Sequence, residues 1–117
     1  MKWILVAALS FVGCQRQTHF DCADSVKREL ISPDGRYVAL MFERDCGATT
    51  SVSTLVAIRE SRKRLDLKEA RLILSLKESW DLALEWNSPQ ALTIHLPEGA
   101  RTYTKLATWQ GVQITYR

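Results

Sequence analysis

Cysteine and histidine side chains, the usual protein ligands of zinc, are few in this sequence of 117 residues. They comprise three cysteines and two histidines, Cys14, Cys22, Cys46, His19 and His95. A zinc site needs several such ligands at tight spacing, whereas Cys22 and Cys46 are far apart and only the two histidines are present to join them. We therefore predict no metal site and no cofactor.

Hydrolysis by a serine or histidine is the next chemistry to consider. Ser88 stands beside Pro89, without the glycine spacing of a nucleophile elbow. His95 alternates with Ile94 and Leu96, which is typical of an exposed or hydrogen-bonded structural histidine on a strand. The sequence has no glycine-rich loop to hold a phosphate. We predict no catalytic residues and no enzymatic activity, with a hydrolase as the least favoured alternative.

The third chemistry is the attachment of lipid to a cysteine near the N-terminus. Lys2 is followed by an apolar run that ends at Gly13 and Cys14. The run is too short to span a membrane, which takes about 20 residues, but it fits the hydrophobic region of an export signal. It resembles the signal of bacterial lipoproteins, although Phe11 replaces their usual Leu. The resemblance implies that residues 1–13 are removed and that Cys14 is diacylated. The alternative is an N-terminal core strand or helix of a cytosolic protein.

The residues after Cys14 bear on location. Residues 14–24 are mostly polar and would form a tether that reaches roughly 30 Å when extended. Gln15 stands where enterobacterial lipoproteins that stay in the inner membrane carry Asp. The resemblance to that sorting rule implies a lipid anchor in the cell envelope, at the outer membrane and facing the periplasm.

The remaining cysteines have consequences for folding. If Cys14 carries lipid, Cys22 and Cys46 are left as one candidate pair in an oxidising compartment. A disulfide between them would close a loop of about 24 residues and contribute roughly 3 kcal/mol. Two buried free thiols remain the alternative.

Two features suggest a binding surface. Arg59, Arg62, Lys63 and Arg64 form a basic cluster that suits acidic lipid headgroups, lipopolysaccharide or an acidic partner. The alternative is a solvated loop, because carboxylates lie close by in the sequence. Trp109, before Gln110 and Gly111 in a predicted turn, is the best candidate for an exposed anchor. After loss of Lys2 the net charge falls from +3 to +2, which argues against nucleic-acid binding.

The elements that must position these residues are strands. From Val26 onward apolar residues alternate with a period of two. Residues 26–31 and 36–44 flank the turn sequence Ser-Pro-Asp-Gly and predict a hairpin. In residues 37–42 both faces are apolar, which predicts a buried strand. Further alternating runs at residues 51–59, 72–76, 82–86, 92–96 and 112–116 predict about seven short strands. We expect residues 25–117 to form one antiparallel all-β domain, a small sheet or sandwich, with a helix over residues 65–77 as the less favoured alternative.

Two segments resemble known sequences. Residues 31–40, ISPDGRYVAL, resemble the blade motif of TolB-type β-propellers, and residues 86–94, WNSPQALTI, resemble a degenerate second copy. A closed propeller needs at least four blades, and this chain has material for about two. The resemblance therefore implies blade-like hairpins within a smaller domain.

A second resemblance covers most of the chain after residue 13. Residues 42–50, FERDCGATT, lie between the Ser-Pro-Asp-Gly strand and a strand rich in Ser, Thr and Val. This arrangement resembles a family of small, uncharacterised bacterial exported proteins and lipoproteins. The resemblance implies a disulfide between Cys22 and Cys46, and it implies no activity.

These observations predict a lipid-anchored envelope protein that acts by binding another envelope protein. The alternative is an inhibitor or immunity-type protein that protects the envelope from a lytic enzyme.

Overall fold

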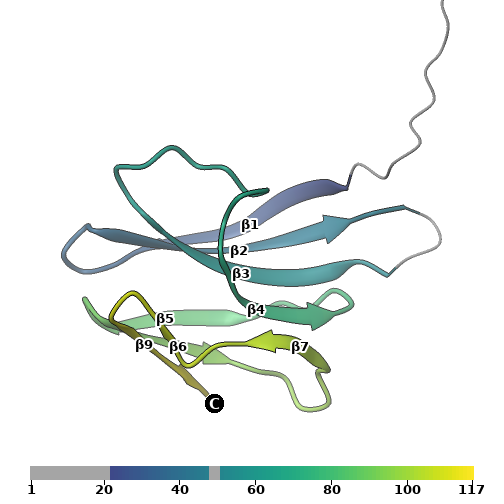
Figure 1. Ribbon diagram of the computed structural model, residues 1–117. Helices are drawn as coiled ribbons and strands as arrows, with labels where there is room; N and C mark the ends of the chain where they lie inside the picture. The colour runs from purple at the N-terminus through teal and green to yellow at the C-terminus, as the bar shows by residue number, and fades with distance from the viewer. Residues whose placement is uncertain (1–21, 48–50) are drawn as a thin grey trace, which may run out of the picture.

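The computed structural model describes residues 22–47 and 51–117. The predicted signal peptide, the lipidated Cys14 and most of the tether lie outside the described residues. The described residues form two β-sheets that pack face to face as a sandwich (Figure 1). They contain no helix, so the alternative helix over residues 65–77 is wrong; a turn occupies part of that segment.

Nine strands build the two sheets. The first sheet has the order β1-β2-β3-β4-β7, with β1 (Ala23–Ile31), β2 (Tyr37–Asp45), β3 (Ser53–Glu60), β4 (Leu72–Lys77) and β7 (Thr102–Lys105). The second has the order β5-β6-β9-β8, with β5 (Ala83–Ser88), β6 (Ala91–His95), β9 (Val112–Tyr116) and β8 (Thr108–Trp109). The all-β prediction is confirmed, as are the hairpins β1–β2 and β5–β6.

The expected purely antiparallel arrangement fails at one pair. Strands β6 and β9 are parallel. After β6 the chain crosses to the first sheet as β7 and returns through β8, so β9 enters the second sheet in the same direction as β6 (Figure 1). Both β7 and β8 are short and lack the apolar alternation from which the other strands were predicted.

The main core lies between the sheets. It is built from inward-facing residues of β2, β3 and β4 against those of β5, β6 and β9. The prediction that β2 is buried on both faces is confirmed, since all six residues from Tyr37 to Phe42 are buried. Trp86 is half-buried against this core. Its indole Nε1 donates to the Leu30 carbonyl at 2.9 Å, which ties β5 to the edge strand β1.

A second, smaller apolar cluster lies on the outer face of the first sheet. Residues 61–71 leave the end of β3, cross over this face and return to begin β4 (Figure 1). Leu67, Ala70 and Leu72 pack there against Phe42, Leu55 and Ala57. The segment therefore covers this face with apolar contacts and keeps the Phe42 side chain buried.

Polar contacts fix the start of β3 and the turn between β1 and β2. Thr54 is fully buried; its hydroxyl donates to the Glu78 carbonyl at 2.7 Å and accepts from the Trp80 amide at 2.9 Å. At the β1–β2 turn, the Gly35 amide donates to the Ser32 carbonyl at 2.9 Å, and Gly35 has a φ of +77°. A positive φ is where glycine is favoured, which accounts for the Ser-Pro-Asp-Gly sequence of this turn.

Candidate functional site

The two ends of the sandwich differ in character. Cys22 and Cys46 form a disulfide just before β1 and just after β2, at the end where the described chain begins. Strand β2 starts at the other end, and its nine residues cover about 25 Å. We call that other end the distal end; it consists of residues 34–37, 58–66, 69–71 and 109–110 (Figure 1). Lys68 reaches back toward the disulfide, where its Nζ donates to the Cys22 carbonyl at 3.4 Å.

Trp109 lies at the distal end, at the close of β8. Its ring meets the Tyr37 ring edge-on, with centroids 5.5 Å apart and planes at 88°. The sequence predicted an exposed anchor; Trp109 is instead half-buried, because the tight turn at Gln110 and Gly111 folds it back over β2. The rest of the indole lines a hollow at the surface.

The basic cluster divides into residues with different roles. Arg59 lies on the outer face of β3, and its Nη1 donates to the carbonyls of Glu60, Ser61 and Lys63 at 3.0–3.3 Å. Arg59 therefore organises the start of the 61–71 segment, with a guanidinium that is only partly exposed. Lys63 pairs with Glu60 at 3.5 Å. Arg62 and Arg64 are exposed.

One hollow unites Trp109 with most of this cluster. It has a volume of about 220 Å³, and its apolar residues are Ile58, Leu65, Ala70 and Trp109. Its charged rim consists of Arg59, Glu60, Lys63, Arg64, Asp66, Glu69 and Arg71. The hollow exists because β4 pairs with β3 only as far as Ala57, opposite Leu72. The last residues of β3 therefore have no β4 neighbour. We call this the apolar hollow.

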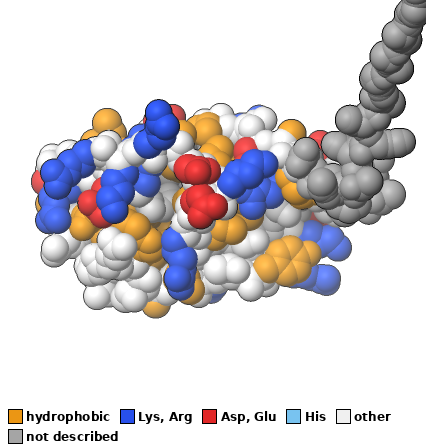
Figure 2. All heavy atoms as spheres, turned by 45° about the horizontal axis from the view of Figure 1, so that its top comes forward, with side chains coloured by type: hydrophobic (Ala, Val, Ile, Leu, Met, Phe, Trp, Pro, Cys, Tyr) orange, Lys and Arg blue, Asp and Glu red, His pale blue; other side chains and the backbone are white. Residues whose placement is uncertain are grey.

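The sequence did not predict the contribution of Leu65 or Arg71. Both residues reach the hollow only because the 61–71 segment folds back across the sheet. Figure 2 looks partly onto this side of the molecule and shows Lys and Arg side chains alternating with carboxylates toward its left, distal end. The predicted dilution of the basic cluster by carboxylates is thus present in space as well as in sequence.

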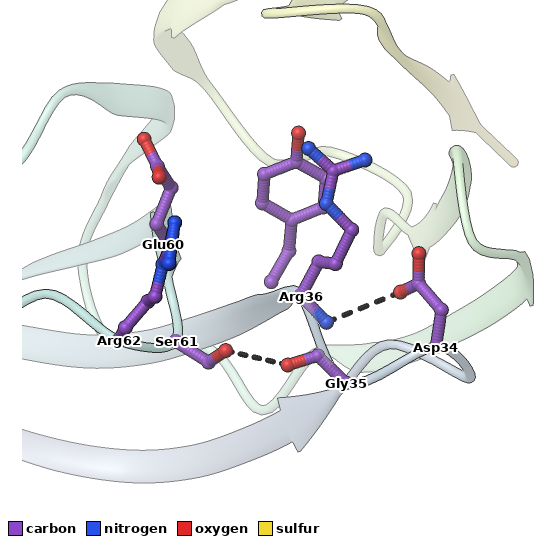
Figure 3. Close-up of a pocket in the computed structure, with 7 residues that line it drawn as sticks. Asp34, Gly35, Arg36, Glu60, Ser61 and Arg62 are labelled. Atoms are coloured by element: carbon purple, nitrogen blue, oxygen red, sulfur yellow. Dashed lines mark hydrogen bonds between the residues drawn. The ribbon is translucent and has the colours of Figure 1, made fainter.

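A second hollow, of about 370 Å³, lies beside the first and is polar. Asp34, Gly35, Arg36, Tyr37, Glu60, Ser61 and Arg62 line it. The Cζ atom of Arg36 lies over the Tyr37 ring, 5.3 Å from its centroid. Figure 3 shows the Arg36, Asp34 and Glu60 side chains projecting to the same side. The Asp34 carboxylate accepts two hydrogen bonds, one from the Ser32 hydroxyl at 2.7 Å and one from the Arg36 amide at 3.2 Å. These hydrogen bonds lower the pKa of the Asp34 carboxyl. Asp34 is therefore ionised at neutral pH, the wrong state for a general acid.

The residues considered for hydrolysis are not brought together. In the β5–β6 hairpin, Ser88 pairs with Ala91 at the turn, whereas His95 pairs with Ala83 at the far end. The Ser88 hydroxyl accepts a hydrogen bond from the Gln90 amide at 3.2 Å. His95 lies 3.5 Å from Glu85, and both are exposed. Within residues 22–47 and 51–117, no group of three or more His, Cys, Asp or Glu is arranged to hold a metal ion.

Comparison of this chain with protein-family models, with curated proteins and with solved structures finds no match. No helix among the described residues is long and apolar enough to cross a membrane. The functional argument therefore rests on the residues of the chain itself.

Proposed function

We propose that this protein is a lipid-anchored protein of the bacterial cell envelope that binds another envelope protein through its distal end. Cys14 would carry the lipid, at the outer membrane and facing the periplasm, and the described domain would be the binding module. The resemblance of the N-terminal residues to a lipoprotein signal supports the anchor, and the Cys22–Cys46 disulfide is in keeping with an oxidising compartment.

The observation that carries the proposal is that Trp109 lines the same hollow as Arg59, Lys63 and Arg64, three of the four residues of the basic cluster. Trp109 and the basic cluster lie far apart in the sequence, and the sequence pattern predicts a partner contact at each of them. Protein interfaces commonly combine an aromatic anchor and arginines around an apolar centre. The apolar hollow has this composition.

The placement of the hollow supports the same proposal. The described chain begins at the disulfide end of the domain, and the distal end lies roughly 25 Å away, about the length of one strand. A tether attached at the disulfide end leaves the distal end directed away from the membrane that holds the lipid. A partner would then reach the hollow without competing with the bilayer.

The test is site-specific photocrosslinking in intact cells. A photoreactive amino acid would replace Arg64 at the distal end, Lys27 on the edge strand β1, or Gln113 on the outer face of the second sheet; all three positions are exposed. We expect one discrete crosslinked protein from position 64, and markedly less from positions 27 and 113. Cys14→Ala, which removes the lipidation site, should leave the protein unanchored and reduce the crosslink from position 64.

Each other outcome counts against part of the proposal. Equal crosslinking from all three positions, or none from position 64, would overturn the distal end as the binding surface. Full crosslinking by Cys14→Ala would show that the anchor is not needed. A crosslink to a lysozyme or another lytic enzyme would identify the protein as the inhibitor or immunity-type alternative.

A further inference from the structure

At the distal end, most carboxylates have a partner within the fold, whereas four arginines have no ion-pair partner among the described residues. Arg36, Arg62, Arg64 and Arg71 are exposed there, and none forms an ion pair with a carboxylate of the described residues. Most of the carboxylates beside them already have partners. The distal end therefore presents unpaired guanidinium groups, even though acidic side chains stand among them.

The partners of those carboxylates are specific. Glu60 pairs with the ammonium group of Lys63 at 3.5 Å. Asp66 accepts hydrogen bonds from the backbone amides of Lys68 and Glu69 at 3.1 and 3.4 Å. Asp34 accepts from the Ser32 hydroxyl and the Arg36 amide. One oxygen of each of these carboxylates is bonded within the fold. Arg64 and Arg71 on the rim of the apolar hollow form no ion pair within the described residues, so their guanidinium groups can donate to an incoming carboxylate.

The floor of the apolar hollow favours an apolar group, whereas its charged rim favours a carboxylate. Ile58 and Ala70 line it, Leu65 is 37% exposed, and one side of the Trp109 indole remains available. An apolar side chain that enters such a hollow removes both surfaces from water, which is favourable. A floor of this kind next to unpaired arginines selects for two chemistries at once, an apolar group and a carboxylate close to it.

We infer that the apolar hollow receives an apolar or aromatic side chain of a protein partner, and that a neighbouring Asp or Glu of that partner pairs with Arg64 and Arg71. This inference rests on the proposed function and names the chemistry of the partner. A uniform polyanion such as a polyphosphate or an acidic polysaccharide fits less well. It would meet the carboxylates of Glu60, Asp66 and Glu69 on the same rim, and it would leave the apolar floor unused.

The inference is tested by selecting ligands from a random-peptide phage library on the intact domain, with the disulfide formed. We expect the enriched peptides to share a large apolar residue next to Asp or Glu. The double variant Arg64→Glu/Arg71→Glu should bind a synthetic peptide of that consensus about tenfold more weakly, because two rim attractions become repulsions. The difference should shrink at high salt.

The matched control is Arg101→Glu/Arg117→Glu, which changes net charge equally at exposed positions outside the hollow. It should bind the consensus peptide as the wild type does. Enriched peptides without acidic residues, no enrichment, or equal loss in both double variants would each overturn the inference. Polyphosphate that binds and displaces the peptide equally well would favour a polyanion instead. A crosslink from position 64 in cells, together with any of these results, would leave the proposed function standing and refute only the stated partner chemistry.

Discussion

Arg59 and Arg64 belong to the same basic run, yet the fold gives them opposite roles. Arg59 follows Leu55 and Ala57 on the outer face of β3, so its guanidinium lies where the backbone of residues 60–63 turns away from the sheet. Arg64 lies beyond the strand and projects from the segment itself. The position of the strand end decides which arginine supports the loop and which remains available to a partner.

Thr54 is the residue at which a single hydroxyl does most for the structure. Its two hydrogen bonds join the start of β3 to the turn after β4, and it has no exposed surface. Thr54→Val keeps the shape but leaves the Trp80 amide and the Glu78 carbonyl without this partner. We expect a loss of about 1–3 kcal/mol in the free energy of unfolding, measured by urea denaturation. Thr115→Val, at an exposed position, should change it by less than about 0.5 kcal/mol; equal losses would contradict the role of Thr54.

Tyr116 should make stability depend on pH in the alkaline range. Its hydroxyl donates to the Leu106 carbonyl at 2.7 Å and lies 3.2 Å from the Ile73 carbonyl, and burial raises its pKa to about 12. Because the pKa in the unfolded chain is about 10, the folded state favours the neutral phenol. The contribution of Tyr116 to the free energy of unfolding is therefore fully present below a pH of about 10 and is lost as the pH rises toward about 12.

The check on Tyr116 is urea unfolding across that pH range, with tyrosinate followed by ultraviolet absorbance. Tyr116→Phe cannot ionise, so its stability should fall less steeply between these pH values than that of the wild type. An equally steep fall in Tyr116→Phe would show that other groups cause the alkaline unfolding.

At the scale of elements, the 61–71 segment is the part of the fold that most affects the candidate site. It covers the outer face of the first sheet through Leu67 and Ala70, and it supplies much of the rim of the apolar hollow. Arg44 also holds it, since its guanidinium pairs with Asp24 at 2.8 Å and donates to the Leu67 carbonyl at 3.2 Å. The hydrogen bonds that Arg44 donates to the Asp24 carboxylate raise the pKa of Arg44, which stays charged throughout the physiological range.

Loss of the Arg59 contacts should open this segment locally. Arg59→Met keeps the aliphatic stem and removes the donors to three backbone carbonyls. We expect trypsin to cleave after Arg62, Lys63 or Arg64 about tenfold faster, because local opening exposes these bonds to the protease. Arg101→Met, outside the segment, should leave that rate unchanged. Unaltered cleavage in Arg59→Met would mean that the apolar contacts alone hold the segment.

The sequence predicts some of these elements well and others not at all. The continuous apolar run at residues 37–42 and the alternation at residues 92–96 are local signals, so the buried strands and both hairpins follow from them. The parallel pairing of β6 with β9 depends on where the chain returns after β7, which no local pattern records. The apolar hollow is harder still, because it joins Ile58, Arg71 and Trp109 across three separate segments. Only the types of Trp109 and the basic cluster marked them as candidates.

For the whole molecule, the disulfide has the largest single effect on stability that we expect. Cys22 and Cys46 are 24 residues apart, and the bond restricts the unfolded chain over that loop. The free energy of unfolding of the double variant Cys22→Ser/Cys46→Ser, measured by urea denaturation, should be about 3 kcal/mol lower than that of the wild type. A reducing agent should lower the stability of the wild type by a similar amount and have no effect on the double variant. Equal sensitivity of both proteins to the reducing agent would contradict this expectation.

The position of that bond also determines how the domain would carry mechanical load. β1 is an edge strand that pairs only with β2, and most of its residues are exposed. A pull applied at the N-terminal side against a partner held at the distal end would reach Cys22 before β1. The disulfide passes the force directly to Cys46 and the buried strand β2, so the covalent bond protects the edge strand β1 from being peeled away.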